Sequence, residues 1–161
     1  MDKKLFILCP FSNTEYLLRK IFGENTYFLT SPGAILYFEY YPNMEAISDL
    51  IILEKINYIY LVNDTSCRFI NGIVKKTKQY GLPVEKILEE IYIEHYFSEF
   101  KDKSLTKQQL NLAKLNLQNQ GDEILKARFL GSLIHEKNTY LKGLITANQK
   151  EILSKTEIKK K

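Results

Sequence analysis

Short apolar runs alternate with amphipathic stretches along most of this chain, and this alternation limits its fold more than any other feature. The runs of strand length are KLFILC (4–9), TYFLT (26–30), NYIYLV (57–62) and YLKGLIT (140–146). Runs of this kind, bounded by turn-forming residues, are typical of buried strands. Because helical patterns separate them, we expect parallel pairing with right-handed crossovers. The sequence therefore predicts an α/β fold with three layers, α-β-α, around a central, mostly parallel sheet of four to five strands.

The intervening segments carry apolar side chains at helical spacing. The pattern predicts helices over residues 13–22, 43–55, 67–79, 84–100 and 106–136. Gly23 is expected to end the first helix and Asn43 to cap the second. Thr106 and Gln109 resemble a capping box for the last helix, in which Gly121 and Gly131 are weak points. Ile152 and Leu153 are expected to form a short final strand.

The size and composition of the chain favour one soluble domain over residues 1–161. Apolar residues make up 45% of the 161 residues and charged residues 26%, which is close to a globular average. No run is long enough to cross a bilayer, and no signal peptide is visible, so no membrane partner is expected. Two cysteines without a signal peptide fit a reducing, cytoplasmic location.

The net charge of +4 does not predict nucleic-acid binding. Much of the excess lies in the last seven residues, 155–161, which we expect to form a basic and disordered tail. Elsewhere acidic and basic residues are mixed, and no readable nucleic-acid motif is present.

Both cysteines are expected at one edge of the sheet, where parallel strands end and ligands usually bind. Cys9 closes the first strand, residues 30–33 close the second, and Asp64 and Cys67 follow the third. Two thiolates and one carboxylate could hold Zn²⁺ with a fourth position open.

Simpler interpretations of these residues stay open. Cys9 could be an ordinary core residue, since free cysteine is often buried. Asp64 could cap the turn before the following helix. Neighbouring strand ends could also bring Cys9 and Cys67 within range of a disulfide.

The order of these motifs resembles the β-class carbonic anhydrases. That family carries Cys-x-Asp-Ser-Arg after its first core strand, then an Asn-Ala-Gly turn, then His-x-x-Cys. This chain has CPFSN at 9–13, SPG at 31–33 and DTSC at 64–67. Residues 113–125 and 140–152 are similar to the family's late helix and closing strand. The resemblance covers nearly the whole chain and implies the β-carbonic-anhydrase fold, with zinc held by Cys9, Asp64 and Cys67.

The departures from the family pattern fall on its catalytic groups. Asp64 stands where the family has a zinc-binding His, which would make the metal shell more negative and its bound water less acidic. Phe11 and Asn13 occupy the positions of the family's Asp and Arg, so the resemblance implies that no catalytic residue remains there. Arg68 replaces a common Gly. We expect Phe11, Ser12, Gly33 and Arg68 to line the pocket, where Arg68 could fill the space or recruit a small anion.

Three functions follow as hypotheses. The leading one is a divergent carbonic-anhydrase-like protein that has lost standard CO2 hydration and can still bind zinc. The second is an active zinc lyase or hydrolase that acts on CO2 or a related electrophile such as COS or CS2. The third is a metal-free interaction module. The resemblance also implies a homodimer or a larger even-numbered oligomer. Because the family's N-terminal arm has no counterpart here, the aromatic stretch Tyr37–Tyr41 or the late helix is the expected interface.

Overall fold

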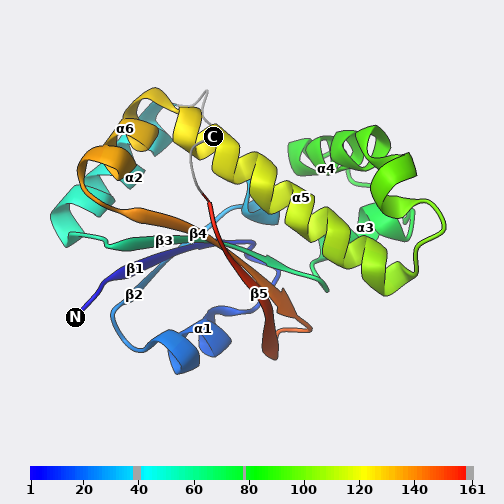
Figure 1. Ribbon diagram of the computed structural model, residues 1–161, viewed down its shortest axis with the longest axis horizontal. Helices are drawn as coiled ribbons and strands as arrows, with labels where there is room; N and C mark the ends of the chain where they lie inside the picture. The colour runs from blue at the N-terminus through cyan, green and yellow to red at the C-terminus, as the bar shows by residue number, and fades with distance from the viewer. Residues whose placement is uncertain (38–40, 78, 159–161) are drawn as a thin grey trace.

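A single five-stranded sheet organises the structure, a computed structural model that describes residues 1–37, 41–77 and 79–158 (Figure 1). Its strands are β1 (Lys4–Leu8), β2 (Thr26–Thr30), β3 (Tyr58–Asp64), β4 (Tyr140–Ala147) and β5 (Glu151–Glu157). Their order is β2-β1-β3-β4-β5, with β5 antiparallel to β4 and the other neighbours parallel. The predicted mostly parallel sheet of four to five strands is confirmed.

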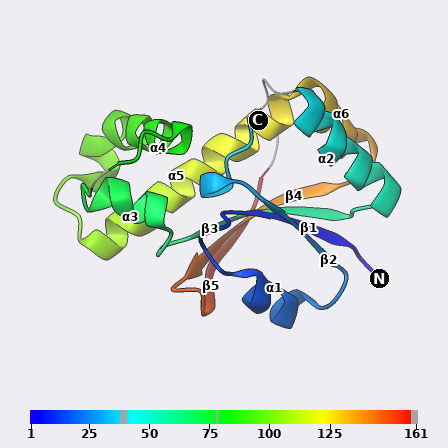
Figure 2. The same cartoon turned by 180° about the vertical axis from the view of Figure 1, so that it is seen from behind.

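Helices cover the two faces of the sheet unequally. The helical elements are α1 (Glu15–Phe22), η1 (Pro32–Ala34), α2 (Tyr41–Glu54), α3 (Arg68–Val74), α4 (Pro83–Glu94), η2 (Tyr96–Phe100), α5 (Leu105–Lys126) and α6 (Arg128–Glu136). Helix α1 lies alone on one face, and the other α-helices gather on the opposite face, as both views show (Figures 1 and 2). The α-β-α layering is therefore confirmed, with one thin layer and one thick layer.

The alternation of side chains along β1 explains which residues face which layer. Leu5, Ile7 and Cys9 belong to the large core under the thick helical layer. Phe6 and Leu8 belong to the small core under α1. Because successive side chains of a strand point to opposite faces, Cys9 continues the row of Leu5 and Ile7. The position of Cys9 thus follows from the strand pattern itself.

Several helix boundaries differ from those predicted. Helix α2 begins at Tyr41, so Asn43 lies inside it and is not its cap. Helix α3 ends at Val74, five residues before the expected end at Gln79. Helix α4 ends at Glu94, and a π-helical turn, η2, follows it. The first helix does end at Gly23, whose φ of 86° only glycine adopts easily.

The long helix predicted over 106–136 is two helices. Ser104, and not Thr106, caps α5, because the Ser104 hydroxyl accepts a 3.2 Å hydrogen bond from the Lys107 N–H. The break falls at Ala127, whose extended backbone (φ −62°, ψ 129°) interrupts the helix, while Gly121 and Gly131 lie within α5 and α6. Tertiary packing thus tolerated both glycines where propensity alone marked them as weak points.

Two expectations, the basic tail and the aromatic interface stretch, can be compared with the structure only in part. Of the tail expected over 155–161, Lys155 to Glu157 belong to β5, and residues 159–161 lie outside the described residues. Of the aromatic stretch 37–41, residues 38–40 and the side chain of Tyr41 also lie outside them. Among the described helices, none is long and apolar enough to cross a membrane.

Candidate functional site

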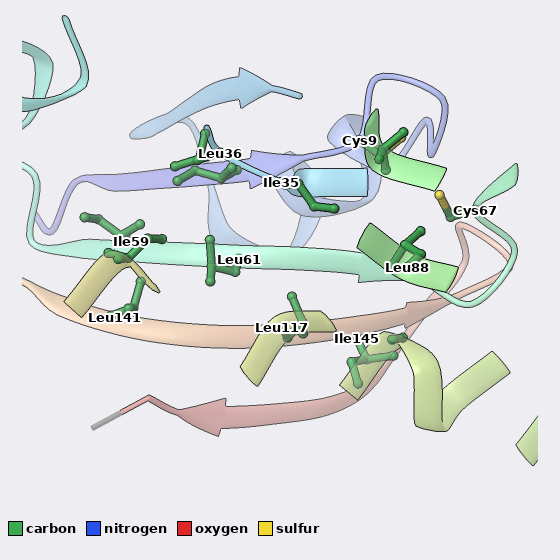
Figure 3. Close-up of a cluster of buried hydrophobic side chains, with 14 of the residues drawn as sticks. Cys9, Ile35, Leu36, Ile59, Leu61, Cys67, Leu88, Leu117, Leu141 and Ile145 are labelled. Atoms are coloured by element: carbon green, nitrogen blue, oxygen red, sulfur yellow. The ribbon is translucent and has the colours of Figure 1, made fainter. Parts of the chain in front are cut away.

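The two cysteines meet at the carboxyl end of the sheet, as the sequence predicted. Cys9 follows β1, and Cys67 directly precedes α3 in the turn after β3. Figure 3 shows them side by side at this edge, with the Cys67 sulfur directed toward Cys9. Both are free thiols, with only 1% and 2% of their surfaces exposed. The edge of the sheet therefore holds a buried pair of sulfurs.

The two thiols differ in their pKa values. A hydrogen bond from the Cys67 thiol lowers the pKa of Cys9 from 9.0 to about 6, against the opposing effect of burial. Backbone N–H groups of Gly33 and Phe11 and the charge of Arg68 act in the same direction. The hydrogen bond to Cys9, together with burial, raises the pKa of Cys67 well above 9.0. The arrangement therefore favours a thiolate on Cys9 beside a neutral thiol on Cys67.

A clamp of buried amides holds the turn that faces Cys9. The carbonyl oxygen of Gly33 accepts hydrogen bonds from the side-chain amides of Asn63 (3.1 Å) and Asn116 (3.0 Å). The Asn116 amide also donates to Asn63 Oδ1 at 2.8 Å. Gly33 has a φ of 67°, and a Cβ there would lie 2.6 Å from Val84 Cγ2. Glycine is thus required at this position both by its backbone and by the space beside it.

Ser12 and Asn13 shape the turn after β1. The Ser12 hydroxyl, 2% exposed, donates to the Cys9 carbonyl at 2.7 Å and lies 3.1 Å from the Thr14 hydroxyl. The Ser12 N–H donates to the same carbonyl at 3.1 Å. Asn13 has a φ of 51°, in the left-handed region that asparagine tolerates well. Ser12 and Asn13 therefore hold the backbone of the turn that carries Cys9.

Asp64 lies at the same sheet edge but its carboxylate is engaged elsewhere. Its Oδ2 accepts hydrogen bonds from the Thr146 hydroxyl (2.6 Å) and the Gln149 N–H (2.9 Å). Its Oδ1 accepts from the Ser66 hydroxyl and, at 2.8 Å, from the Ser66 N–H. The carboxylate thus joins the end of β3 to β4 and to the turn after it.

Strand alternation explains why Asp64 turns away from Cys9. On β3, Ile59 and Leu61 face the thick helical layer, as does Asn63, which contacts Asn116 of α5. Tyr60 and Val62 face the α1 layer, and Asp64 follows them in the alternation. Cys9 faces the thick layer. Asp64 and Cys9 therefore begin on opposite faces of the sheet.

As they are placed, the three predicted ligands do not fit a three-ligand zinc site. Among the described residues, no group of three or more His, Cys, Asp or Glu side chains is arranged to hold a metal ion. Cys9 and Cys67 supply two suitable sulfur donors, but both oxygens of Asp64 already accept hydrogen bonds. Zinc ligation by Asp64 stays a prediction that would require the carboxylate to leave these partners.

Phe11 and Arg68 form an exposed stack beside the thiol pair. The Arg68 guanidinium lies 5.1 Å from the ring centroids of both Phe11 and Tyr80 and 5.9 Å from that of Phe69. The Phe11 and Phe69 rings meet edge to face at 5.7 Å. A cavity of about 230 Å³ adjoins the stack and is lined by Arg68, Phe69, Gly72, Ile73, Thr77, Tyr80 and Glu85. Phe11 and Arg68 thus occupy the surface beside the two cysteines.

Four residues of this region were not singled out from the sequence. They are Asn63, Asn116, Thr146 and Tyr80. A signal existed for Asn63, because an amide at an inward position of an apolar strand needs buried partners. Asn116, Thr146 and Tyr80 come from distant parts of the chain, and only the tertiary structure brings them to the strand ends.

The comparisons with known proteins agree on one fold. No protein-family model and no curated protein matches the sequence. Among solved structures, a tetrameric β-carbonic anhydrase of Sordaria macrospora is 13% identical, with a TM-score of 0.77 over 96% of this chain and 82% of that one. The β-carbonic anhydrase CafD of Aspergillus fumigatus is 16% identical, with a TM-score of 0.75 over 91% and 84%.

A third solved structure gives the same result. The Coccomyxa β-carbonic anhydrase in complex with acetazolamide is 12% identical, with a TM-score of 0.72 over 97% of this chain and 74% of that one. The low identities fit a strongly divergent sequence, while the alignments cover almost the whole chain. The chain has the fold of the β-carbonic anhydrases.

Proposed function

We propose that this chain is a divergent carbonic-anhydrase-like protein that does not carry out ordinary CO2 hydration and uses its sheet-edge pocket for binding. The observation that carries the proposal is the contact between Phe11 and Arg68. Phe11 stands at the position where the family that this chain resembles has the Asp of its Asp–Arg pair. Phenylalanine can neither accept a proton nor pair with a cation through charge. Asn13 in the place of the family's Arg removes the second group. The acid–base step thus lacks both of its side chains.

The chemistry of the pocket favours a small anion, or a CO2-like molecule, as its ligand. Within the described parts of the chain, Arg68 forms none of the ion pairs with carboxylates. Its guanidinium lies against aromatic rings, and its charge also favours the thiolate of Cys9. The one carboxylate in the cavity lining, that of Glu85, accepts hydrogen bonds from the N–H groups of Tyr80 and Leu82. A planar guanidinium that lies against aromatic rings is well suited to bind a planar oxyanion such as bicarbonate.

The direct test is a stopped-flow measurement of CO2 hydration by the purified protein. We expect a rate equal to that of buffer and equal to that of the matched variant Cys67→Ser. Hydration above buffer that disappears in Cys67→Ser would contradict the proposal. It would support the alternative of an active zinc enzyme, for which COS and CS2 are the next substrates to assay.

Zinc binding is a second candidate function, and the buried thiol pair favours it. Cys9 and Cys67 would hold the zinc ion through their sulfurs, and Asp64 would become the predicted third ligand only after its carboxylate leaves the hydrogen bonds to Thr146 and Ser66. Metal analysis of protein purified without chelators tests this. Bound zinc that is lost in Cys67→Ser would support it, and zinc bound more tightly in Asp64→His would identify Asp64 as a ligand. If the purified protein contains no zinc, the binding function is that of a metal-free interaction module.

We place this function in the cytoplasm and in a homodimer or larger even-numbered oligomer. Two free cysteines fit a reducing compartment. A solved protein with this fold is tetrameric. Light scattering coupled to gel filtration measures the oligomer directly, and a monomer at micromolar concentration would contradict this part of the proposal.

A further inference from the structure

The thiol pair has the arrangement of a two-sulfur redox couple. Cys9 and Cys67 are the two cysteines of the chain, so no third thiol of the same chain competes for either. They come from segments far apart in sequence, yet they lie side by side at one edge of the sheet, with the Cys67 sulfur directed toward Cys9 (Figure 3). Both are almost fully buried, with 1% and 2% exposure. Their meeting therefore belongs to the folded core and needs no rearrangement of the sheet.

The backbones on both sides of the pair are fixed. On the Cys9 side, the carbonyl of Cys9 accepts two hydrogen bonds from Ser12. On the other side, the Cys67 N–H donates to the Asp64 carbonyl at 3.0 Å, and the Cys67 carbonyl accepts from the Asn71 N–H at 2.9 Å. Since neither backbone is free to drift, the two sulfurs stay opposed in the native state.

We propose that Cys9 and Cys67 form a reversible disulfide in the folded protein, which makes this sheet edge a site of oxidative modification by hydroperoxides. The inference rests on the proposed function, since it requires a pair that is not permanently occupied by metal. A disulfide here would join the end of β1 to the start of α3. It would also fix the two segments that carry Phe11 and Arg68.

Hydrogen peroxide supplies the oxidising equivalents for both steps. The sulfur of Cys9 attacks one peroxide oxygen, the O–O bond breaks, and Cys9 becomes a sulfenic acid while water leaves. The sulfur of Cys67 then attacks the Cys9 sulfur, the S–O bond breaks, and a second water leaves. Two thiol hydrogens and one peroxide molecule thus give one disulfide and two waters. A dithiol reductant reverses the change by thiol–disulfide exchange.

Phe11 and Arg68 are exposed side chains next to the pair, and ring contacts join them. Phe11 lies two residues after Cys9 and is 48% exposed, and Arg68 directly follows Cys67 and is also exposed. Their mutual contact is a cation–π stack at 5.1 Å, an interaction of modest strength at a surface. Because both sulfurs are almost fully buried, oxidation requires this contact to open, and a small oxidant such as hydrogen peroxide needs less opening than a protein disulfide or a large reagent does.

The experiment follows both thiols in the native, reduced protein during treatment with one equivalent of hydrogen peroxide. Samples are quenched by alkylation, and non-reducing peptide mapping by mass spectrometry locates the products. We expect both thiols to be lost one for one, in a reaction that is first order in protein and first order in peroxide, with a second-order rate constant that does not change with protein concentration. We also expect a single cross-linked peptide pair containing residues 9 and 67, unchanged far-UV circular dichroism, and full recovery with dithiothreitol.

Two matched variants and a parallel experiment with Zn²⁺-loaded protein complete the test. Cys67→Ser should stop at a sulfenic acid on Cys9 that a dimedone-type reagent traps, and Cys9→Ser should give no cross-link. Protein loaded with stoichiometric Zn²⁺ should be protected if zinc occupies the pair. The inference would be overturned by any of three results. These are wild-type thiols that can still be alkylated after peroxide treatment, a cross-link that forms only between chains, and a cross-link that appears only in denaturant. CO2 hydration is measured separately, so a failure of the proposed function is recognised independently of the thiol result.

Discussion

Asp64 on β3 accepts a 2.6 Å hydrogen bond from the hydroxyl of Thr146 on β4, and this bond joins the carboxyl ends of the two strands near the thiol pair. The two residues are direct partners in the parallel register of β3 and β4. Both are almost completely buried, at 1% and 0% exposure. The contact therefore gives Asp64 a structural role that can be measured separately from any role in metal binding.

Replacing Asp64 by Ala should lower the free energy of unfolding by about 1–3 kcal/mol, because Thr146 and the Ser66 N–H would lose a buried acceptor. Thr146→Val, which removes one hydroxyl and keeps the shape, should cost about 0.5–1.5 kcal/mol. Urea titration followed by circular dichroism measures both. A fully stable Asp64→Ala protein that loses bound zinc would show that Asp64 is a ligand and not a structural acceptor.

Most of the fold could be predicted because strand alternation and strand length are local properties. The run Thr26–Thr30 was predicted with its observed bounds, and Cys9 was expected at the carboxyl edge where it lies. The break at Ala127 could not be predicted, because Ala favours helix and the interruption depends on how α5 and α6 pack. The extension of β5 to Glu157 depends likewise on pairing with β4.

The candidate site was predictable to the level of shared location and not to the level of contacts. The sequence predicted that Asp64, Cys9 and Cys67 lie at one edge of the sheet, because each closes or follows a strand. It left open that Asp64 and Cys9 start on opposite faces, although the alternation of the two strands contained that information. The partners of Asp64 at Thr146 and Gln149 lie more than eighty residues away in the chain. Only tertiary structure reveals such partners.

Stability should rise with pH between about 6 and 9 because of Cys9. Its pKa is about 6 in the folded protein, against an ordinary value of 9.0, so the unfolded chain binds more protons in this window. Above pH 9 the direction reverses, because the raised pKa of Cys67 keeps a proton on the folded protein that the unfolded chain has released. Urea midpoints measured in reductant from pH 5 to 10 should trace this maximum.

The matched control for the pH profile is Cys9→Ser. Other ionisable groups contribute to both proteins, so the difference between the two profiles isolates the thiol pair. We expect the difference in unfolding free energy to grow from pH 6 to pH 9 in favour of the wild type. A constant difference across that window would contradict the thiolate assigned to Cys9.

Removing the Arg68 side chain should expose the thiol pair to alkylation. In Arg68→Ala the stack with Phe11 and Tyr80 is lost, so we expect native-state alkylation by iodoacetamide to accelerate about tenfold, equivalent to about 1.4 kcal/mol of protection. Arg68→Lys keeps the positive charge near Cys9 and loses the planar stack. A rate for Arg68→Lys near that of Arg68→Ala would assign the protection to stacking. Wild-type rates in both variants would mean that Phe11 and Arg68 do not guard the pair.

Gly33 offers the sharpest test of how the turn positions Cys9. Gly33→Ala should destabilise the protein by about 1–3 kcal/mol, because the residue has a positive φ and its new Cβ would lie 2.6 Å from Val84 Cγ2. The pKa of Cys9 should rise in this variant, since the Gly33 N–H moves away from the sulfur. Gly23→Ala is the matched control, because Gly23 also has a positive φ but open space around its Cβ position. It should cost less stability and leave the pH dependence of Cys9 alkylation unchanged. If both variants left that pH dependence at its wild-type midpoint, the Gly33 backbone would have no part in stabilising the thiolate.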